Sequence, residues 1–535
     1  MPQSPPSYTP PLLSTFSPAT SEEVRLAILA SSDATCASDV IPTKLLKLCL
    51  GALLPPITTL INLCLRDSVF PNAFKTSLVS PLLKKHSLPK DDLASYRPIS
   101  NLSFISKILE RIILSRINSH LSTFSSLSSF QSAYRKFHSV ETALLRISND
   151  ILLAIDNQQV TALVLLDLSA AFDTIDHSIL LSRLTSHFGI SGPALQLLSS
   201  YITPRFQSVS IQSHTTLPAP LLSGVPQGSV LGPLLFTLYT TPLTHLLTSS
   251  NIAFHLYADD TQLYISFSAN DSVPCLDSLS TTLTSLYSWF VSNGLAINSS
   301  KTEFLILGTK QQRAKLLSPS LTFNNSTIYP SNSTRNLGVT FDSELSFSQH
   351  ISEICKSSYF IIRQLRQIRS SLDLKSSILL ANALVSSKLD FCNSLFYNLS
   401  CNSLHRLQLI QNSAARFVFP SVRRHQHISP TLQRLHWLPV SQRILFKIAL
   451  ITFKTLQSSF PSYLCDLLTP YSPSRTLRSS NKNLLFIPNL KSAAARRSFS
   501  FAAPTVWNSL PLSLRTTTSL TTFRSKLKTF LFKPP

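Results

Sequence analysis

Acidic residues are scarce in this sequence. Its 535 residues contain 25 Asp and Glu against 47 Lys and Arg, which gives a formal net charge of +22. So large a positive surplus indicates an anionic partner, and nucleic acid is the first candidate. The surplus is concentrated in residues 391–535, which hold 19 Lys and Arg and a single acid, Asp466. Residues 421–535 are therefore predicted to form a basic nucleic-acid-binding region.

Several other signals are missing. The eight cysteines form no Cys-x-x-Cys pair and have no histidine pair beside them at zinc-binding spacing, so a zinc site is not predicted. Scattered thiols favour a reducing compartment. The sequence has no run of 18 apolar residues and no recognisable secretion signal at its start, so neither a membrane span nor secretion is expected.

Glycine is also rare, with nine residues in the whole chain. Eight of them lie between Gly189 and Gly338. Scarce glycine is expected where the backbone needs a positive φ or must approach a ligand closely. This stretch is therefore predicted to contain the functional site of the chain.

Two adjacent carboxylates, Asp259 and Asp260, interrupt an apolar and aromatic run at residues 252–267. The apolar residues on either side predict two short strands, with the acids at the tip of a hairpin. An arbitrary Asp-Asp pair is most often an ordinary turn. A second feature favours a functional site, because Asp167 directly follows the buried-strand candidate at residues 160–166. Carboxylates at the tips of neighbouring strands can hold two divalent ions about 3.5–4 Å apart, and oxygen ligands suit Mg²⁺.

Three motifs follow one another along the chain: LDLSAAFD at residues 166–173, GVPQGS at 224–229 and YADD at 257–260. In this order they resemble the three central palm motifs of reverse transcriptases, and their residues are most similar to those of non-LTR (LINE-type) retrotransposons. Further matches extend the resemblance from about Ser77 to Phe347. They are YRPI at 96–99, FQSAYR at 130–135, NSSKTE at 298–303 and NLGV at 336–339.

The resemblance implies an α+β right-hand polymerase fold with fingers, a palm sheet and a helical thumb. It implies an RNA-directed DNA polymerase that transfers nucleotides from dNTPs to a primer 3′-OH. Asp167, Asp259 and Asp260 are then the expected catalytic residues and the ligands of two Mg²⁺ ions, for which Mn²⁺ could substitute. Adjacent residues of a strand point to opposite faces, so Asp259 is expected to bind metal more tightly than Asp260.

The remaining site residues also come from the resemblance. The residues expected to contact the incoming nucleotide are Arg97, Phe172, Gln227, Gly228 and Lys301. Those expected near the primer end are Tyr257, Ala258 and Gly338.

Some of these residues have ordinary structural alternatives. Phe172 is expected to exclude a ribose 2′-OH, but it could be a core residue at a strand-to-helix turn. Lys301 could be a solvated turn residue, and residues 336–342 could be a simple β-hairpin. Asp176 is assigned to the N-cap of the helix that follows it. Asp173 is expected to support the site or cap a helix rather than to bind metal.

The predicted domains follow composition and motif positions. They are a disordered N-terminus at 1–20, a helical lead-in at 21–74, fingers and palm at 75–345, thumb-like helices at 346–420 and the basic region at 421–535. LINE-type proteins have an endonuclease before the polymerase, and the segment upstream of residue 75 is too short to be one. A truncated element product or a fragmentary gene model is therefore expected.

The expected partners are an RNA template, a DNA primer and dNTPs, with a ribonucleoprotein formed on element RNA as a further expectation. No membrane partner is expected, and nuclear action follows from the family. The main alternative is a catalytically silent RNA-binding remnant of a retroelement. A maturase-like splicing cofactor is disfavoured because the surrounding motifs are of the LINE type.

Overall fold

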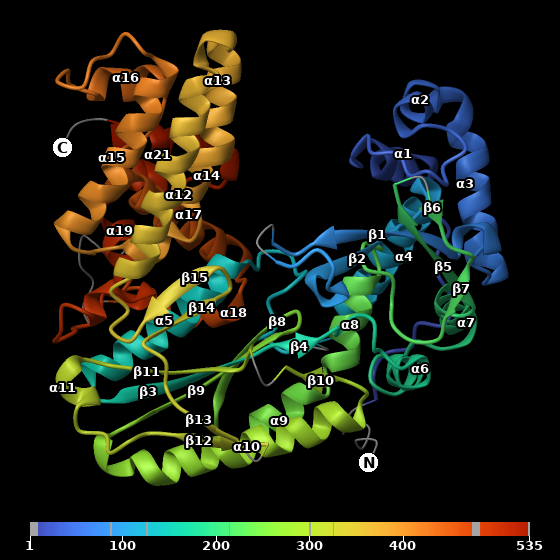
Figure 1. Cartoon of the computed structure of the whole chain (residues 1–535), viewed down its shortest axis with the longest axis horizontal. Coiled ribbons are helices and arrows are strands. Elements are labelled where there is room, and N and C mark those ends of the chain that lie inside the picture. Colours follow the sequence, from blue (N-terminus) through green and yellow to red (C-terminus); the bar gives the residue numbers. More distant parts are fainter. Residues whose placement is uncertain are drawn as a thin grey trace. The chain divides into compact units, whose positions relative to one another are not determined.

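The computed structural model describes residues 9–85, 88–124, 127–212, 214–298, 301–324, 326–472 and 482–532. The chain divides into two compact units (Figure 1). The first unit comprises residues 1–128, 167–251 and 284–299, and the second comprises residues 129–166, 252–283 and 300–535. Each unit is therefore discontinuous in sequence. None of the helices in the described part of the chain has the length and apolar character needed to cross a membrane.

The first unit contains a five-stranded sheet in which β1 lies between β2 and β5. Its strands are β1 (Thr76–Leu83), β2 (Tyr96–Asn101), β5 (Arg205–Ile211), β6 (His214–Thr215) and β7 (Ala219–Leu221). Strand β1 is antiparallel to β2 and parallel to β5. A separate short pair in the same unit joins β4 (Leu168–Ser169) to β10 (Ala296–Ile297).

Helices make up most of the rest of the first unit. They are α1 (Ser21–Leu29), α2 (Thr43–Leu48), α3 (Leu50–Asp67), α4 (Phe104–Leu121), α6 (His177–Ser186), α7 (Gly192–Ile202), α8 (Gly232–Thr240) and α9 (Leu243–Ser249). Helix α6 begins where the sequence predicts, because the Asp176 carboxylate accepts a hydrogen bond from the Ile179 N–H at 3.0 Å and so caps the helix.

Part of the segment predicted to be disordered, residues 9–20, has defined contacts instead. The Leu13 N–H donates to the Gly189 carbonyl at 2.9 Å, and the Ala194 N–H donates to the Ser14 carbonyl at 2.8 Å. A Cβ added to Gly189 would lie 2.1 Å from the Pro11 carbonyl oxygen. The Pro- and Ser-rich composition predicted disorder, whereas backbone hydrogen bonds to the start of α7 hold residues 11–14 in place.

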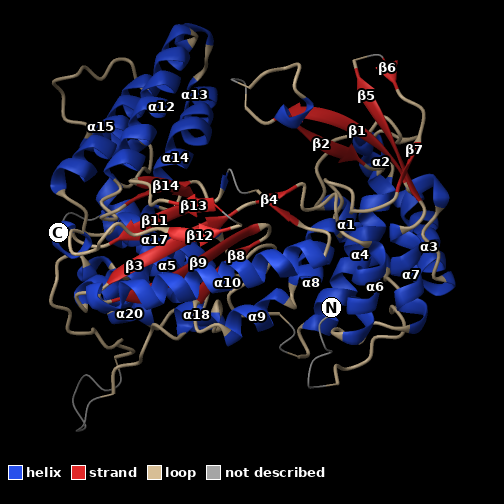
Figure 2. Ribbon diagram, turned by 60° about the horizontal axis from the view of Figure 1, so that its bottom comes forward, coloured by secondary structure: helices blue, strands red, loops and turns tan. Residues whose placement is uncertain are grey.

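The second unit contains a four-stranded antiparallel sheet in the order β11-β3-β9-β8 (Figure 2). Its strands are β3 (Val160–Leu166), β8 (Ala253–Tyr257), β9 (Asp260–Phe267) and β11 (Glu303–Leu307). Six of the seven residues of β3 are buried, as expected for a strand with neighbours on both sides. The two strands and the hairpin predicted at residues 252–267 are confirmed, and so is their pairing with the strand that precedes Asp167.

Helix α5 (Val140–Asp156) packs on this sheet. Ser139 caps it: its hydroxyl accepts from the Thr142 N–H at 3.1 Å, and the Thr142 hydroxyl accepts from the Ser139 N–H at 2.9 Å. Leu144, Ile147 and Ile151 on one face of the helix are fully buried. Full burial of such a side chain contributes roughly 1.5–3 kcal/mol, so this face fixes α5 against the strands.

The remaining strands of the second unit form two hairpins. One pairs β12 (Leu321–Phe323) with β13 (Ser326–Ile328), and the other pairs β14 (Ser333–Asn336) with β15 (Val339–Asp342). Helix α11 (Lys310–Arg313) follows β11, and α10 (Ser272–Ser292) follows β9 and runs from the second unit into the first.

The C-terminal part of the second unit is helical, as the sequence predicts. Its helices are α12 (Ser348–Gln367), α13 (Leu374–Ala381), α14 (Ser387–Asp390), α15 (Cys401–Val418), α16 (Ser429–Arg434), α17 (Val440–Ser458), α18 (Ser462–Cys465), α19 (Phe499–Ser509), α20 (Leu512–Arg515) and α21 (Leu520–Phe532). In Figure 1, α12, α13 and α15 lie side by side. A single hydrophobic core joins the sheet and α5 to these helices and extends as far along the chain as Leu527.

Candidate active site

The paired acids lie at the tip of the β8–β9 hairpin. Tyr257 pairs with Asp260, so Ala258 and Asp259 are the two central residues of the turn. Ala258 has a φ of +56°, in the left-handed region that costs a residue with a Cβ roughly 1–2 kcal/mol relative to ordinary backbone. Strained backbone of this kind is often found where a functional group must be held in one position. The turn holds both carboxylates half-buried at the end of two ordered strands.

The third acid follows the neighbouring strand. In the β3–β9 ladder Leu166 pairs with Thr261. Asp167 follows Leu166 by one peptide bond, and Asp260 precedes Thr261 by one peptide bond. The Asp167 carbonyl accepts a hydrogen bond from the Asn298 N–H at 2.9 Å, which fixes the backbone at the start of the loop.

Nearby tyrosines respond to the charge at the hairpin tip. Burial raises the pKa of Tyr134, and the negative charge of Asp259 raises it further. Burial also raises the pKa of Tyr257, with smaller contributions from Cys392 and Asp260. Both carboxylates therefore act on their surroundings as a negative potential, which is the condition for attracting a cation.

These acids offer oxygen donors only, the ligand type that Mg²⁺ prefers. Among the residues that the structure describes, no three His, Cys, Asp or Glu side chains are gathered into a ready-made metal cage. Mg²⁺ is usually held by one or two carboxylates together with water and substrate phosphates, so the donor set at the hairpin tip fits this ion.

A buried polar network supports β8 directly behind the tip. The His255 ring is fully buried, and its Nε2 lies 2.8 Å from the Ser132 hydroxyl. The Ser132 hydroxyl also lies 2.8 Å from the Tyr463 hydroxyl, which donates to the Thr142 hydroxyl at 2.9 Å. Three other segments of the second unit, which carry Ser132, Thr142 and Tyr463, are thus tied to the strand that carries the tip. Tyr463 was not predicted as part of the site, since it comes from α18, far along the chain.

The protonation of His255 should make the fold sensitive to acid. Burial lowers the pKa of His255 to about 3, so the neutral ring is favoured in the folded state. The unfolded chain takes up this proton near its ordinary pKa of about 6.5, so stability is complete above that pH and falls as the pH drops from 6.5 towards 3. At pH 4 the loss from this residue should be on the order of 3 kcal/mol.

This prediction can be checked by measuring melting temperature against pH for the wild type and for His255→Gln. The variant should be the less stable protein at pH 7.5, and the difference should shrink steadily towards pH 4.5. A difference that stays constant over this range would show that His255 is not the titrating group.

A second cluster of motif residues lies in the first unit. The Gln227 side-chain amide donates to the Asp173 carboxylate at 2.7 Å, and the Ser100 N–H donates to the Gln227 carbonyl at 2.7 Å. The Val225 N–H donates to the Phe172 carbonyl at 2.8 Å. The structure therefore brings together β2, the segment after β4 and the loop before α8.

Two glycines make this close approach possible. Gly224 has a φ of +82°, and a Cβ there would lie 2.6 Å from the Asp173 carbonyl oxygen. Gly228 has a φ of +114°, and a Cβ there would lie 2.8 Å from the Ser100 carbonyl oxygen. Any other residue would be strained at both positions and would push the neighbouring backbone away.

Phe172 is half-buried and packs against Phe236 of α8, with ring centroids 4.8 Å apart. This contact holds the ring in a defined position, and its sugar-selecting role stays a prediction. Burial raises the pKa of Asp173, while the hydrogen bond from Gln227 lowers it. Asp173 thus orients the Gln227 amide, in keeping with the supporting role expected for it.

Glu110 of α4 was missed by the sequence analysis. It is fully buried, and its Oε2 accepts from the Val230 N–H at 2.7 Å and the Leu231 N–H at 3.0 Å. The Tyr201 hydroxyl donates to the same oxygen at 3.2 Å. Burial raises the pKa of Glu110, and the charge of the nearby Arg205 opposes this shift. Glu110 therefore anchors the start of α8, directly after the loop that carries Gln227. The sequence feature that could have indicated Glu110 is the presence of an acid within the apolar face of a predicted helix.

The other expected site residues lie on separate elements. Arg97 is exposed on β2, and Lys301 is exposed just before β11. Gly338 lies in the turn of the β14–β15 hairpin with a φ of +89°. The Asn336 amide donates to Gln262 of β9 at 2.7 Å, so this hairpin is tied to the strand that begins at Asp260. Residues 336–342 do form a hairpin, and their contact with a primer stays a prediction.

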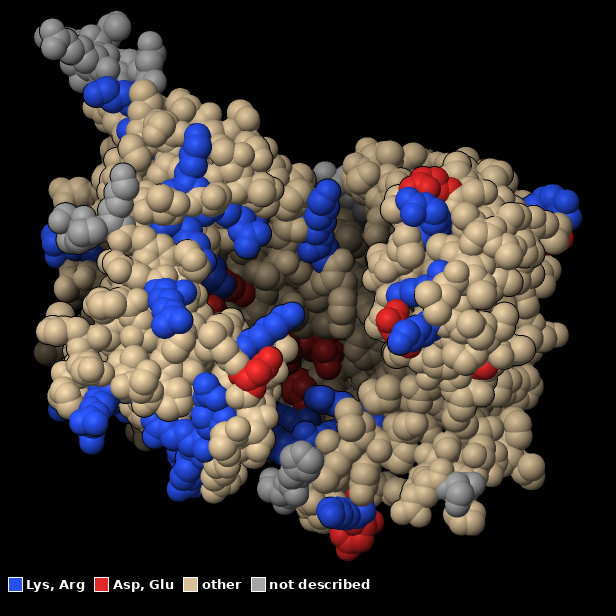
Figure 3. Space-filling model, turned by 90° about the horizontal axis from the view of Figure 1, so that it is seen from above, with Lys and Arg blue, Asp and Glu red and all other residues tan. Residues whose placement is uncertain are grey.

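Lys and Arg side chains are spread widely over the face drawn in Figure 3, where Asp and Glu are fewer. This agrees with the net charge of +22. A surface of this kind favours contact with phosphate groups along an extended ligand.

Comparison with known proteins identifies the relatives of this chain. Residues 84–341 match the family described as reverse transcriptase (RNA-dependent DNA polymerase). The probable RNA-directed DNA polymerase from transposon BS of Drosophila melanogaster is 28% identical over 365 residues, which are 67% of this chain and 40% of that protein. The corresponding protein from transposon X-element of the same organism is 28% identical over 410 residues, which are 74% of this chain and 43% of that protein.

The chain thus spans about two fifths of the length of these relatives. A solved structure of telomerase from Candida albicans, in complex with a fragment of telomeric RNA, aligns with 74% of this chain and 66% of its own, at a TM-score of 0.37 and 13% identity. The resemblance of the ordered motifs is confirmed by these sequence matches. Residues 84–341 match the reverse transcriptase family, and the chain is similar to the RNA-directed DNA polymerases of these two transposons.

Proposed function

We propose that this protein is an RNA-directed DNA polymerase, which adds dNTPs to a primer 3′-OH as it copies an RNA template. The observation that carries the proposal is the pairing of Leu166 with Thr261 in neighbouring antiparallel strands. Asp167 follows the last residue of β3, and Asp260 is the first residue of β9, so both acids lie at the same end of these two strands. Carboxylates that come from such neighbouring positions can share a pair of ions.

Asp167, Asp259 and Asp260 are the proposed ligands of two Mg²⁺ ions, with Mn²⁺ as a substitute. When bound, the ions would lower the pKa of the primer 3′-OH and neutralise charge on the leaving pyrophosphate. The left-handed backbone at Ala258 fixes the turn that carries the half-buried Asp259 carboxylate, which would serve as one of the metal ligands. Because the protein supplies no covalent nucleophile, its contribution is to position the reactants and stabilise their charge.

The residues around Gln227 are proposed to receive the incoming nucleotide. The hydrogen bond to Asp173 fixes the direction of the Gln227 side chain, and Gly228 lets the backbone come close. Phe172, held against Phe236, would lie under the sugar and exclude a 2′-OH. Arg97 and Lys301 are proposed to contact the triphosphate, and Tyr257 and Gly338 the primer end.

The alternative function is RNA binding without catalysis, which the basic C-terminal residues would also support. If element RNA is the natural template, the active form would be a ribonucleoprotein, and its place of action would be the nucleus.

Primer extension separates the two functions. The purified protein is incubated with poly(rA)/oligo(dT), labelled dTTP and Mg²⁺, and incorporation is followed over time. The polymerase proposal predicts elongated products that disappear when EDTA removes the divalent ion and return when Mg²⁺ is restored. RNA binding with no incorporation under any divalent ion would overturn the proposal and leave the silent remnant.

A further inference from the structure

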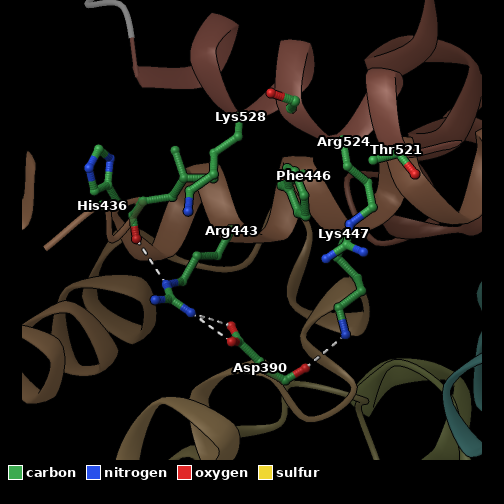
Figure 4. A pocket seen from close by; sticks show the side chains of 10 residues that line it. Asp390, His436, Arg443, Phe446, Lys447, Thr521, Arg524 and Lys528 are labelled. Carbon is green, nitrogen blue, oxygen red and sulfur yellow. Dashed lines mark hydrogen bonds and ion pairs between the residues drawn. The ribbon is translucent and has the colours of Figure 1, made fainter. Parts of the chain in front are cut away.

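A cavity in the C-terminal part of the second unit has no role in the polymerase chemistry described above. Its volume is about 480 Å³. The wall combines side chains from α14, the segment before α17, α17 itself and α21 (Figure 4). The lining residues are Asp390, His436, Leu438, Arg443, Phe446, Lys447, Thr521, Arg524, Ser525 and Lys528.

Positive charge dominates this cavity. Four cationic side chains, Arg443, Lys447, Arg524 and Lys528, face one carboxylate, Asp390. These cations come from two helices that are separate in sequence, α17 and α21. The packing of α17 against α21 therefore concentrates like charges, which ordinarily repel one another.

Two of the four cations are neutralised within the protein. Arg443 donates to both carboxylate oxygens of Asp390, at 2.6 and 2.8 Å. Lys447 donates to the Glu141 carboxylate at 3.0 Å and to the Asp390 carbonyl at 3.1 Å. Asp390 and Glu141 are thus both paired with cations of α17.

Arg524 and Lys528 have no such partner, since neither makes a hydrogen bond or an ion pair with any residue that the structure describes. Figure 4 shows both side chains reaching into the cavity from α21, with Phe446 between them. Burial lowers the pKa of Lys528, and the charges of Arg443 and Arg524 lower it further. Lys528 is therefore held where its charge is unfavourable unless an anion enters.

We propose that this cavity binds a backbone phosphate of an RNA strand through Arg524 and Lys528. The Thr521 and Ser525 side chains of the same wall supply neutral hydrogen-bond donors of the kind that commonly contact phosphate oxygens. A volume of about 480 Å³ exceeds what a free phosphate ion occupies and accommodates a nucleotide unit. The cavity extends the proposed polymerase function by giving the template or element RNA an anchor on α21, and it can be tested without any polymerisation.

A third cation of α21 provides a control for the cavity variants. Lys526 is exposed on the same helix, between Arg524 and Lys528, and does not line the cavity. Replacing Arg524 and Lys528 together by glutamine removes two charges from the cavity, while Lys526→Gln removes one charge from the surface nearby. Single variants of each residue complete the set.

Binding of a fluorescein-labelled (rA)₁₂ strand is measured by anisotropy from 50 to 300 mM KCl, without dNTPs. The double variant should bind at least about 10-fold more weakly at 100 mM KCl, and its log–log salt slope should be smaller by about 0.7, the value for one phosphate contact on a single strand. Lys526→Gln should bind within about twofold of the wild type. If Lys526→Gln and Lys528→Gln weakened RNA binding equally, the binding would depend on general surface charge and the proposal would be wrong. Unchanged RNA binding by the double variant would also overturn the proposal.

A second arm distinguishes the strand from a free anion. The melting temperatures of the wild type and the double variant are compared in inorganic phosphate and in KCl at equal ionic strength. If phosphate stabilises only the wild type while (rA)₁₂ binding is the same in both proteins, the cavity takes a free phosphate and the RNA assignment is wrong. Because (rA)₁₂ binding is measured without dNTPs, this test is separate from that of the polymerase function.

Discussion

Asp259→Asn is expected to lower dTTP incorporation by at least about 10³-fold, because a metal ligand supplies several kcal/mol of transition-state stabilisation. Asparagine matches aspartate in size, is well tolerated in turns and lacks the negative charge. The side chain is half-buried at a hairpin tip, so the β8–β9 pairing should survive the change. Steady-state primer extension with poly(rA)/oligo(dT) measures the loss, and the melting temperature reports the fold.

Asp277→Asn is the matched control for this experiment. Asp277 lies on α10, is exposed, and belongs to the same unit as Asp259. Its replacement removes one negative charge at a distance from the hairpin and should leave incorporation unchanged. If Asp259→Asn kept more than a tenth of wild-type activity, the carboxylate would not be a metal ligand and the two-ion arrangement would have to be abandoned.

Glu110→Ala is expected to destabilise the first unit by about 3–5 kcal/mol, the range typical of removing one partner from a buried charged network. The variant would leave the Val230 and Leu231 N–H groups without their acceptor. It would also remove the carboxylate that interacts electrostatically with the fully buried Arg205. A loss of this size corresponds to a fall in melting temperature of roughly 10 °C for a unit of this size.

Glu110→Gln separates the hydrogen bonds from the charge. Glutamine keeps an oxygen acceptor for the two N–H groups, so it should cost less than half as much as alanine. Circular dichroism melts of the three proteins give the comparison. A Glu110→Ala protein that melts within 2 °C of the wild type would mean that the start of α8 is held by other contacts.

The sequence predicted features that depend on short stretches of chain. The apolar run at residues 160–166 became β3 with the expected bounds, and the alternating residues around Asp259 became a hairpin with the acids at its tip. Asp176 was placed correctly as a helix cap, since capping involves residues only three positions apart. Motif order then indicated that β3 and β9 would be neighbours, as the β3–β9 ladder confirms.

Features that depend on distant residues were not predictable in this way. Glu110 meets Val230 across 120 positions, and Ser132 meets Tyr463 across 331. Periodicity reports which face of a helix is buried but not which polar group it will meet there. The cavity on α21 is a similar case, because the sequence showed the surplus of cations but not that two helices would bring four of them together.

The continuity of the core has a practical consequence for dividing this protein. The family match ends at residue 341, yet the hydrophobic core that includes residues of β3 and α5 extends along the chain to Leu527. The hydrogen bond from Tyr463 to Thr142 crosses that limit as well. A fragment cut at residue 341 would expose the apolar residues of the sheet and α5 that belong to this core, and would remove Tyr463 from beside the buried His255 ring. The boundaries of the sequence match and the boundaries that permit independent folding are therefore different in this chain, and the smallest fragment that folds should include the helices up to α21.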